Sequence, residues 1–276
     1  MTEDKYTPIN TEKYPHLFHY RDLNHEHFYS LMRDKKIKFS NPTKLNDPWE
    51  FEAQFCDHWT DPKKRQETAD WLIMNALEIG DIEKSEANHH HTKLMNNKPY
   101  METNLAGTSN HLKHAADEEW RIFCLSKKND NILMWGHYAD SHKGICLVFS
   151  SNKEPFVCAR KVEYEKDMPL LYLPQAARSR EEIISTMLTK PIDWEYEHEY
   201  RYVFSLKTQN QKSTYNSGDF LYLPKGSLVG IIAGCEMSEA NFEFIEMARD
   251  KFMPDLPIYQ AQRDVKKYGI YIPHFP

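Results

Sequence analysis

The segment WRIFCLSKKNDNILMWGHYADSHKGICLVFS, residues 120–150, decides the fold class. It holds two apolar runs of strand length, 121–126 and 144–149, on either side of a short helix expected over 132–138. Four further runs of this kind follow at 155–164, 199–206, 219–224 and 227–234. Short runs rich in β-branched and aromatic residues are typical of strands. We therefore expect an α+β protein whose core is a mixed, largely antiparallel sheet.

Helices are expected in four other parts of the chain. Asn24 can cap a helix that begins near His25, and amphipathic helices are expected over 179–189 and 238–252. The polar segment 62–119 is expected to be mainly helical. We interpret it as a helical insertion in a single α+β domain that spans residues 1–276.

The overall charge and the glycine content exclude several classes of function. Lys+Arg number 35 and Asp+Glu 41, so the net charge is 35 − 41 = −6, which does not favour a broad nucleic-acid-binding surface. Glycine occurs only nine times, and neither GxGxxG nor GxxxxGK[ST] is present. A glycine-rich phosphate loop is therefore not expected.

The distribution of apolar residues and cysteines predicts a cytoplasmic protein. No stretch approaches 18 consecutive apolar residues, and the N-terminal segment is polar, so neither a membrane span nor a secretory signal is expected. The five cysteines are widely spaced and include no CxxC pair, so we expect reduced thiols. Cys124, Cys146 and Cys158 lie in apolar runs and are expected to be buried.

The segment WEYEHEYR, residues 194–201, carries the densest group of carboxylates. If the strand alternates through it, Glu195, Glu197, Glu199 and Arg201 share one face. The interpretation without function is a solvated charged face. The functional interpretation is a catalytic carboxylate outside the core, held by a rigid strand beside an arginine.

Two further segments could contribute a polar or aromatic wall to a pocket. KLNDPWE, residues 44–50, holds Asn46 and Asp47 between turn-forming residues, where they either bond loop amides or face a ligand. In LMWGHY, residues 133–138, Trp135 and Tyr138 either pack in the core or stack on a flat ligand. The run of histidines at 89–91 is expected to be a solvated polar face, because consecutive side chains point in different directions.

These segments resemble the family known as domain of unknown function 2971. The resemblance extends over most of the chain, from about residue 17 to 272. It rests on the order and spacing of the segments 20–21, 39–50, 134–144, 194–201 and 228–234. The family implies no activity.

A more distant resemblance is to the ADP-ribosyltransferase fold, through the order of a strand (HYR, 19–21), a helix, a strand (IKFS, 37–40) and a late ExE strand. It implies an ADP-ribosyltransferase-like core with NAD as substrate and no metal. It also implies that Glu199 and Glu197 supply the catalytic carboxylates. The residues implied to bind NAD are His19, Tyr20, Arg21, Ser40, Asn46, Asp47, Trp135, Tyr138 and Arg201. Phe39-Ser40-Asn41 is an incomplete copy of that fold's serine-threonine-serine motif.

Three functions stay open at this point. The first is a mono-ADP-ribosyltransferase that acts as a toxin or an anti-phage effector, with RNA, DNA or protein as acceptor and an antitoxin or phage component as regulator. The second is a metal-dependent nuclease that uses Asp47, Glu50, Glu197 and Glu199. The third is a non-catalytic sensor that binds a nucleotide or a phage protein in the aromatic cleft.

Overall fold

The structure is a computed structural model that describes residues 8–52, 54–176, 179–207, 216–217 and 219–276. The chain divides into two compact units. Unit 1 comprises Met1–Asn41, Trp120–Tyr164 and Ile192–Pro276, and unit 2 comprises Pro42–Glu119 and Glu165–Pro191. The expectation of one domain with an insertion at 62–119 stays a prediction. Unit 2 joins the helices of that segment to residues 42–61 and 165–191.

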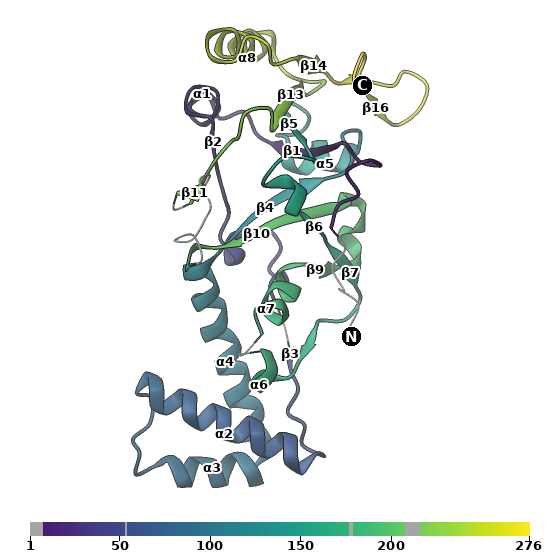
Figure 1. The fold of residues 1–276 in the computed structure, drawn as a ribbon. Helices are drawn as coiled ribbons and strands as arrows, with labels where there is room; N and C mark the ends of the chain where they lie inside the picture. The colour runs from purple at the N-terminus through teal and green to yellow at the C-terminus, as the bar shows by residue number, and fades with distance from the viewer. Residues whose placement is uncertain (1–7, 53, 177–178, 208–215, 218) are drawn as a thin grey trace. The chain divides into compact units, whose positions relative to one another are not determined.

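Unit 1 is built on a seven-stranded sheet with the order β14-β13-β5-β1-β4-β10-β6 (Figure 1). Every pairing is antiparallel except that of β13 with β14, which is parallel. The strands are β1 (His16–Arg21), β4 (Trp120–Ser126), β5 (Ile145–Ser150), β6 (Arg160–Lys161), β10 (Glu199–Ser205), β13 (Leu228–Ala233) and β14 (Ile258–Gln260). The predicted α+β class and the mixed, largely antiparallel sheet are confirmed.

The two faces of this sheet are covered by different helices. On one face, α1 (His25–Asp34) and α8 (Glu239–Phe252) bury side chains such as Phe28 and Ile245 against Leu17 of β1, which we call the first core. On the other face, α5 (Ile132–Tyr138) buries Met134 and Trp135, which we call the second core. The predicted caps Asn24 and Ser238 each accept a hydrogen bond from a first-turn amide.

The middle of the sheet is its weakest connection. Strands β1 and β4 pair only at Phe18 and Ser126, whereas β1 pairs with β5 over six residues and β4 with β10 over seven. Beyond this pair, the His19 ring extends to the Cys124 carbonyl oxygen, with Nδ1 at 2.8 Å, and stacks on the ring of Phe123. A side chain therefore replaces the missing backbone pairing.

Smaller elements complete unit 1. They are the 3₁₀ helices η2 (Phe156–Cys158) and η3 (Ile192–Glu197) and the strands β2 (Lys36–Lys38), β11 (Asn216–Ser217), β12 (Phe220–Tyr222), β15 (Gln262–Arg263) and β16 (Ile270–Tyr271). Strand β7 (Glu163–Glu165) begins in unit 1, and its last residue belongs to unit 2. The continuous strand expected over 155–164 is wrong, because η2 occupies its first part. Cys158 is exposed there, which corrects the expectation that it is buried; all five cysteines are free.

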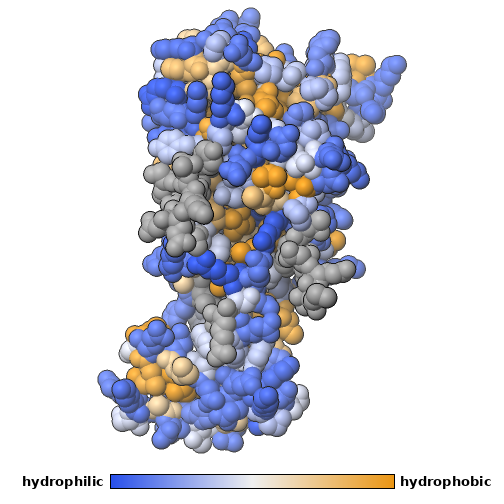
Figure 2. Space-filling model, in the orientation of Figure 1, coloured by the Kyte–Doolittle hydropathy of each residue, from blue (hydrophilic) through white to orange (hydrophobic). Residues whose placement is uncertain are grey.

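Unit 2 is mainly helical, as expected for 62–119. Its small core includes Leu72, Leu94 and Leu105, while Met74 and Ile79 on the outer side of α2 are exposed. Figure 2 shows a hydrophobic area at the lower left, over these helices. The elements are η1 (Pro42–Lys44), β3 (Gln54–Phe55), α2 (Pro62–Ile79), α3 (Ala87–Asn96), α4 (Lys98–Glu119), β8 (Leu170–Leu171), α6 (Leu173–Ala176), α7 (Arg180–Met187) and β9 (Thr189–Pro191). No helix in the described part of the chain is long and apolar enough to cross a membrane.

The turn between α5 and β5 is held by close backbone contacts. Asp140, Ser141 and His142 all have positive φ, a conformation that costs energy in three successive non-glycine residues. Two glycines make this turn fit: a Cβ on Gly144 would overlap the carbonyl oxygen of Arg21, and one on Gly234 would overlap that of His142. The turn therefore fixes where α5 ends relative to the sheet.

We predict that Gly234→Ala lowers the free energy of unfolding by about 2 kcal/mol or more, because backbone must move to admit the methyl group. The matched control is Gly107→Ala in α4, where nothing lies within 4 Å of the added Cβ. This variant gains about 0.5–1 kcal/mol from helix propensity. Denaturant unfolding followed by circular dichroism checks both; equal stability of Gly234→Ala and wild type would contradict the packing described.

Candidate functional site

Glu197, His198 and Glu199 stand where η3 ends and β10 begins. His198 has a φ of 49°, so the chain turns between the two carboxylates instead of alternating through them. The expectation that Glu195, Glu197, Glu199 and Arg201 share one strand face is therefore wrong. Only Glu199 and Arg201 are two positions apart within the strand.

Glu199 and Arg201 form a two-pronged ion pair inside unit 1. Nε and Nη2 of Arg201 lie 2.8 and 2.9 Å from the two carboxylate oxygens of Glu199. Both residues are buried, with 4% and 1% of their surface exposed. The backbone N–H of Glu199 also donates to the Tyr164 hydroxyl at 2.8 Å. Glu199 is thus part of the interior, which corrects the expectation that it lies outside the core.

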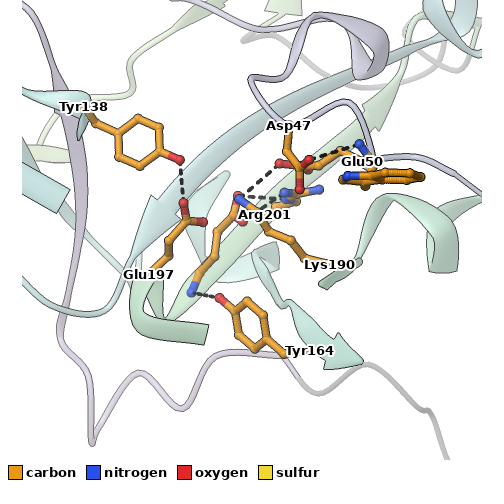
Figure 3. A network of polar contacts seen from close by, with 9 residues as sticks. Asp47, Glu50, Tyr138, Tyr164, Lys190, Glu197 and Arg201 are labelled. Atoms are coloured by element: carbon orange, nitrogen blue, oxygen red, sulfur yellow. Dashed lines mark hydrogen bonds and ion pairs between the residues drawn. The ribbon is translucent and has the colours of Figure 1, made fainter. Parts of the chain in front are cut away.

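Glu197 makes a different contact. Its carboxylate accepts a hydrogen bond from the Tyr138 hydroxyl of α5 at 2.5 Å, and its carbonyl oxygen accepts one from Ser126 Oγ at 2.6 Å (Figure 3). Asn131, the N-cap of α5, donates to the Tyr196 carbonyl oxygen at 2.6 Å. These contacts attach η3 to both ends of α5.

Four aromatic residues that are partly or fully exposed belong to the same two elements as this contact, and we call them the aromatic surface: His137, Tyr138, Trp194 and Tyr196. Tyr138 and Tyr196 also pack against the second core. The ring of Tyr196 lies 6.3 Å from that of His137 and 5.9 Å from that of Trp194. Rings of this kind offer flat faces on which a planar ligand can stack. The aromatic surface therefore adjoins a buried carboxylate.

Positive charge lies near the same junction. The pKa of His198 is lowered, first by its burial and then by the charges of Lys127 and Lys128, with Glu195 and Asp130 acting in the opposite direction. Lys128 is exposed. The Lys127 backbone N–H donates to the His198 carbonyl oxygen at 3.2 Å, so charges of both signs lie near this junction.

Trp135 and Tyr20 belong to the second core, not to the aromatic surface. Trp135 is fully buried, and its indole N–H donates to the Asn129 carbonyl oxygen at 2.8 Å. The Tyr20 ring packs edge-on against Trp135, and its hydroxyl donates to the Lys128 carbonyl oxygen. Burial raises the pKa of Tyr20 well above its usual value. These contacts account for both side chains as packing.

His19 and Arg21 lie on the opposite face of the sheet from Glu199. They alternate with Phe18 and Tyr20 along β1, and the His19 ring stacks on Phe123 of the first core. Burial, the charge of Arg21 and the hydrogen bond to Cys124 together set the pKa of His19 at about 4, the first two lowering it and the third raising it. The structure does not bring the implied first-strand residues to the implied catalytic carboxylate.

The other implied NAD-binding residues lie elsewhere. Ser40 is exposed and pairs through its backbone with Ile122 of unit 1. Asn46 and Asp47 belong to unit 2, where Asp47 Oδ1 accepts from the Trp49 amide at 3.0 Å and is buried. For Asp47 Oδ1 this is the loop-bonding alternative that the turn residues allowed, whereas Asp47 Oδ2 is buried and has no hydrogen-bond partner in the described part of the chain.

Unit 2 has its own buried ion pair. Glu50 Oε1 lies 3.1 Å from Lys190 Nζ, with 2% of each side chain exposed (Figure 3). The pair joins the 44–50 loop to β9. Removing either partner would take this buried ion pair away from the other residue, so the pair helps to specify the path of the loop.

The described residues include no group of three or more His, Cys, Asp or Glu side chains that could hold a metal ion. In the histidine run, His90 Nδ1 contacts the Tyr100 hydroxyl at 2.6 Å, and His91 Nε2 lies 2.9 Å from Asp70 Oδ1. These two histidines therefore connect neighbouring helices of unit 2.

Sequence reasoning did not select Tyr164, Lys190, Lys127 or Lys128 as site residues. Neither Tyr164 nor Lys190 belongs to a recognisable sequence motif. Their roles depend on the distant partners Glu199 and Glu50. The two lysines directly follow the buried strand β4, and that position could have pointed to them.

A family model described as "Protein of unknown function (DUF2971)" matches residues 134–202, about a quarter of the chain. The matched range begins within α5 and ends within β10, so it contains the aromatic surface and both carboxylates. No curated protein and no solved structure matches the chain.

We predict that Glu199→Gln destabilises the protein by about 3 kcal/mol or more, because it removes a buried negative charge that accepts two hydrogen bonds from Arg201. The double variant Glu199→Leu/Arg201→Met, which removes both charges, is expected to recover most of that loss. Denaturant unfolding of the three proteins measures the difference. A single variant as stable as wild type would show that the pair is not buried.

We also predict a loss of stability on acidification that depends on His19. The unfolded histidine binds a proton near pH 6.5, whereas the folded one does so only near its pKa of about 4. The unfolded state therefore gains protons first as the pH falls, and stability drops between pH 6.5 and pH 4. From pH 7 to pH 5, His19→Gln should lose about 1–2 kcal/mol less than wild type. An identical pH dependence in both proteins would contradict the assignment.

Proposed function

We propose that the protein binds a nucleotide-like ligand on the aromatic surface, with its flat ring stacked on Tyr196 and Trp194. The observation that carries this proposal is the chain of ring contacts that joins Trp194 and Tyr196 of η3 to His137 and Tyr138 of α5, where Tyr138 also bonds Glu197. Stacking of one base on an aromatic side chain contributes about 1–3 kcal/mol. The ligand's phosphate groups would approach Lys127 and Lys128, whose charges already act on His198.

The first ligand that we propose is NAD, because it combines two flat rings with a pyrophosphate. The ribose beside its nicotinamide ring would lie toward Glu197. A carboxylate near a ribose can bond its hydroxyl groups and stabilise positive charge at the anomeric carbon. In the structure Glu197 is 2% exposed and covered by the Tyr138 hydroxyl. Contact with a ribose therefore requires the Tyr138 side chain to turn away.

Mono-ADP-ribosyl transfer is our second candidate function. The observation that favours it is the carboxylate of Glu197, which is bonded to Tyr138 next to the aromatic surface. The bond between the anomeric carbon and the nicotinamide nitrogen breaks, and nicotinamide leaves as a neutral molecule. An oxygen or nitrogen of RNA, DNA or a protein then bonds to that carbon and loses a proton. Glu197 would carry this step, since Glu199 is held by Arg201. A role as a toxin or phage-defence effector, regulated by an antitoxin or a phage component, belongs to this candidate.

Binding is tested by isothermal titration calorimetry with NAD, and we predict a saturable heat in wild type. Tyr196→Ala and Trp194→Ala should each weaken binding about fivefold or more, since each removes a stacking face. The matched control is Tyr268→Ala, which removes a fully exposed ring from another part of unit 1. No heat with NAD, or equal affinities in all four proteins, would contradict the proposal.

Turnover is tested separately with labelled NAD, incubated with cell lysate or with total RNA. If the protein is a transferase, wild type transfers label and Glu197→Gln does not, while the calorimetric NAD affinity of the variant stays within about threefold of wild type. Saturable binding without transfer or loss of NAD supports the sensor function. Equal transfer by both proteins would exclude Glu197 as the catalytic carboxylate.

A further inference from the structure

A groove with a volume of about 580 Å³ lies within unit 2, between α4 and the pair of strands β3 and β8. It is lined by Glu52, Gln54, Phe55, Cys56, Asp57, Glu102, Leu105, Ala106, Ser109, Asn110, Met168 and Leu170. None of these residues belongs to the aromatic surface or to unit 1. The groove is thus a second concave surface, independent of the proposed nucleotide site.

Ion pairs close the two ends of the groove. Lys113 of α4 pairs with Glu52, and Lys98 of α4 lies 3.4 Å from Asp57 and 3.6 Å from Glu102. Glu52 therefore lies near the later part of α4 and Asp57 near its beginning. The stretch of α4 from Glu102 to Lys113 spans eleven residues, or about 16 Å. The groove is long enough for an extended segment of chain.

The end of the groove near Lys98 carries excess negative charge. The ammonium group of Lys98 is shared there by the carboxylates of Asp57 and Glu102. Both carboxylates raise the pKa of Lys98. At the other end, one lysine faces one glutamate. A ligand cation placed beside Glu102 would complete the charge balance.

The middle of the groove combines apolar walls with amide groups. Leu170 and Met168 are 64% and 37% exposed, which is high for large apolar side chains. The amides of Gln54 and Asn110 can each donate and accept, as a peptide backbone requires. Methionine and leucine side chains adapt to apolar side chains of various shapes.

From this arrangement we infer that the groove binds a peptide segment in which a lysine or arginine lies beside apolar side chains. The basic group pairs with Glu102 and Asp57, and the apolar groups cover Met168 and Leu170. The backbone of the peptide bonds to Gln54 and Asn110. The inference does not depend on the function proposed for unit 1.

Fluorescence anisotropy with the full chain tests this inference. The probe is a fluorescein-labelled pentapeptide in which leucine and lysine alternate, and the control probe has glutamate in place of lysine. We expect saturable binding of the lysine peptide alone. No saturable binding of the lysine peptide, or equal binding of the glutamate peptide, would overturn the inference.

Variants of α4 place the peptide in the groove. Ala106→Trp fills the groove and should weaken binding about tenfold or more, while Ala115→Trp, half a turn around the same helix, should not change it. Ser109→Trp is a second filling variant in case the first does not fold. Glu102→Gln should weaken binding about twofold to fivefold. Unchanged affinity in the folded filling variants would overturn the inference.

Discussion

The ion pair between Arg201 and Glu199 fixes the arrangement of the candidate site. A charge out of contact with water is stable only when a counter-ion lies at hydrogen-bond distance, and two contacts of 2.8 and 2.9 Å bring these side chains that close. Glu199 must therefore point into unit 1 as β10 begins. Since His198 turns the chain just before it, Glu197 points to α5 and meets Tyr138. The glycine-bearing turn after α5 fixes the other side of that contact.

Two neighbouring carboxylates thus have different surroundings and different uses. Glu199 is neutralised by an arginine and stabilises the fold. Glu197 is bonded to the Tyr138 hydroxyl, beside the rings on which we propose that a ligand stacks. This division is why we propose a role in function for Glu197, and why replacing Glu199 tests stability before it tests activity. The groove of unit 2, for which we propose a peptide ligand, has another chemistry, with excess negative charge at the end near Lys98 and apolar side chains in its middle.

Local sequence patterns predicted the helices and strands of the fold well. They predicted the positions of the site residues less well. The apolar runs at 121–126 and 144–149 and the caps Asn24 and Ser238 are short-range signals, and the structure has those elements. The face of Glu197 was predicted wrongly because period-two reasoning cannot show a single left-handed residue such as His198. The placement of His19 depends on the separation of β1 from β4. The placement of Lys190 depends on its ion pair with Glu50, which lies 140 positions earlier in the chain. Contacts between residues so far apart in the sequence cannot be predicted from the pattern of neighbouring residues.

The account is tested most directly by saturation-transfer difference NMR of NAD with the wild-type protein. The measurement reports which protons of a bound ligand lie closest to the protein. We expect the strongest saturation on the adenine or nicotinamide ring protons, and its loss in the Trp194→Ala/Tyr196→Ala double variant. Absence of saturation, or equal saturation in the double variant, would show that the rings around Tyr138 and Glu197 are not a ligand-binding surface.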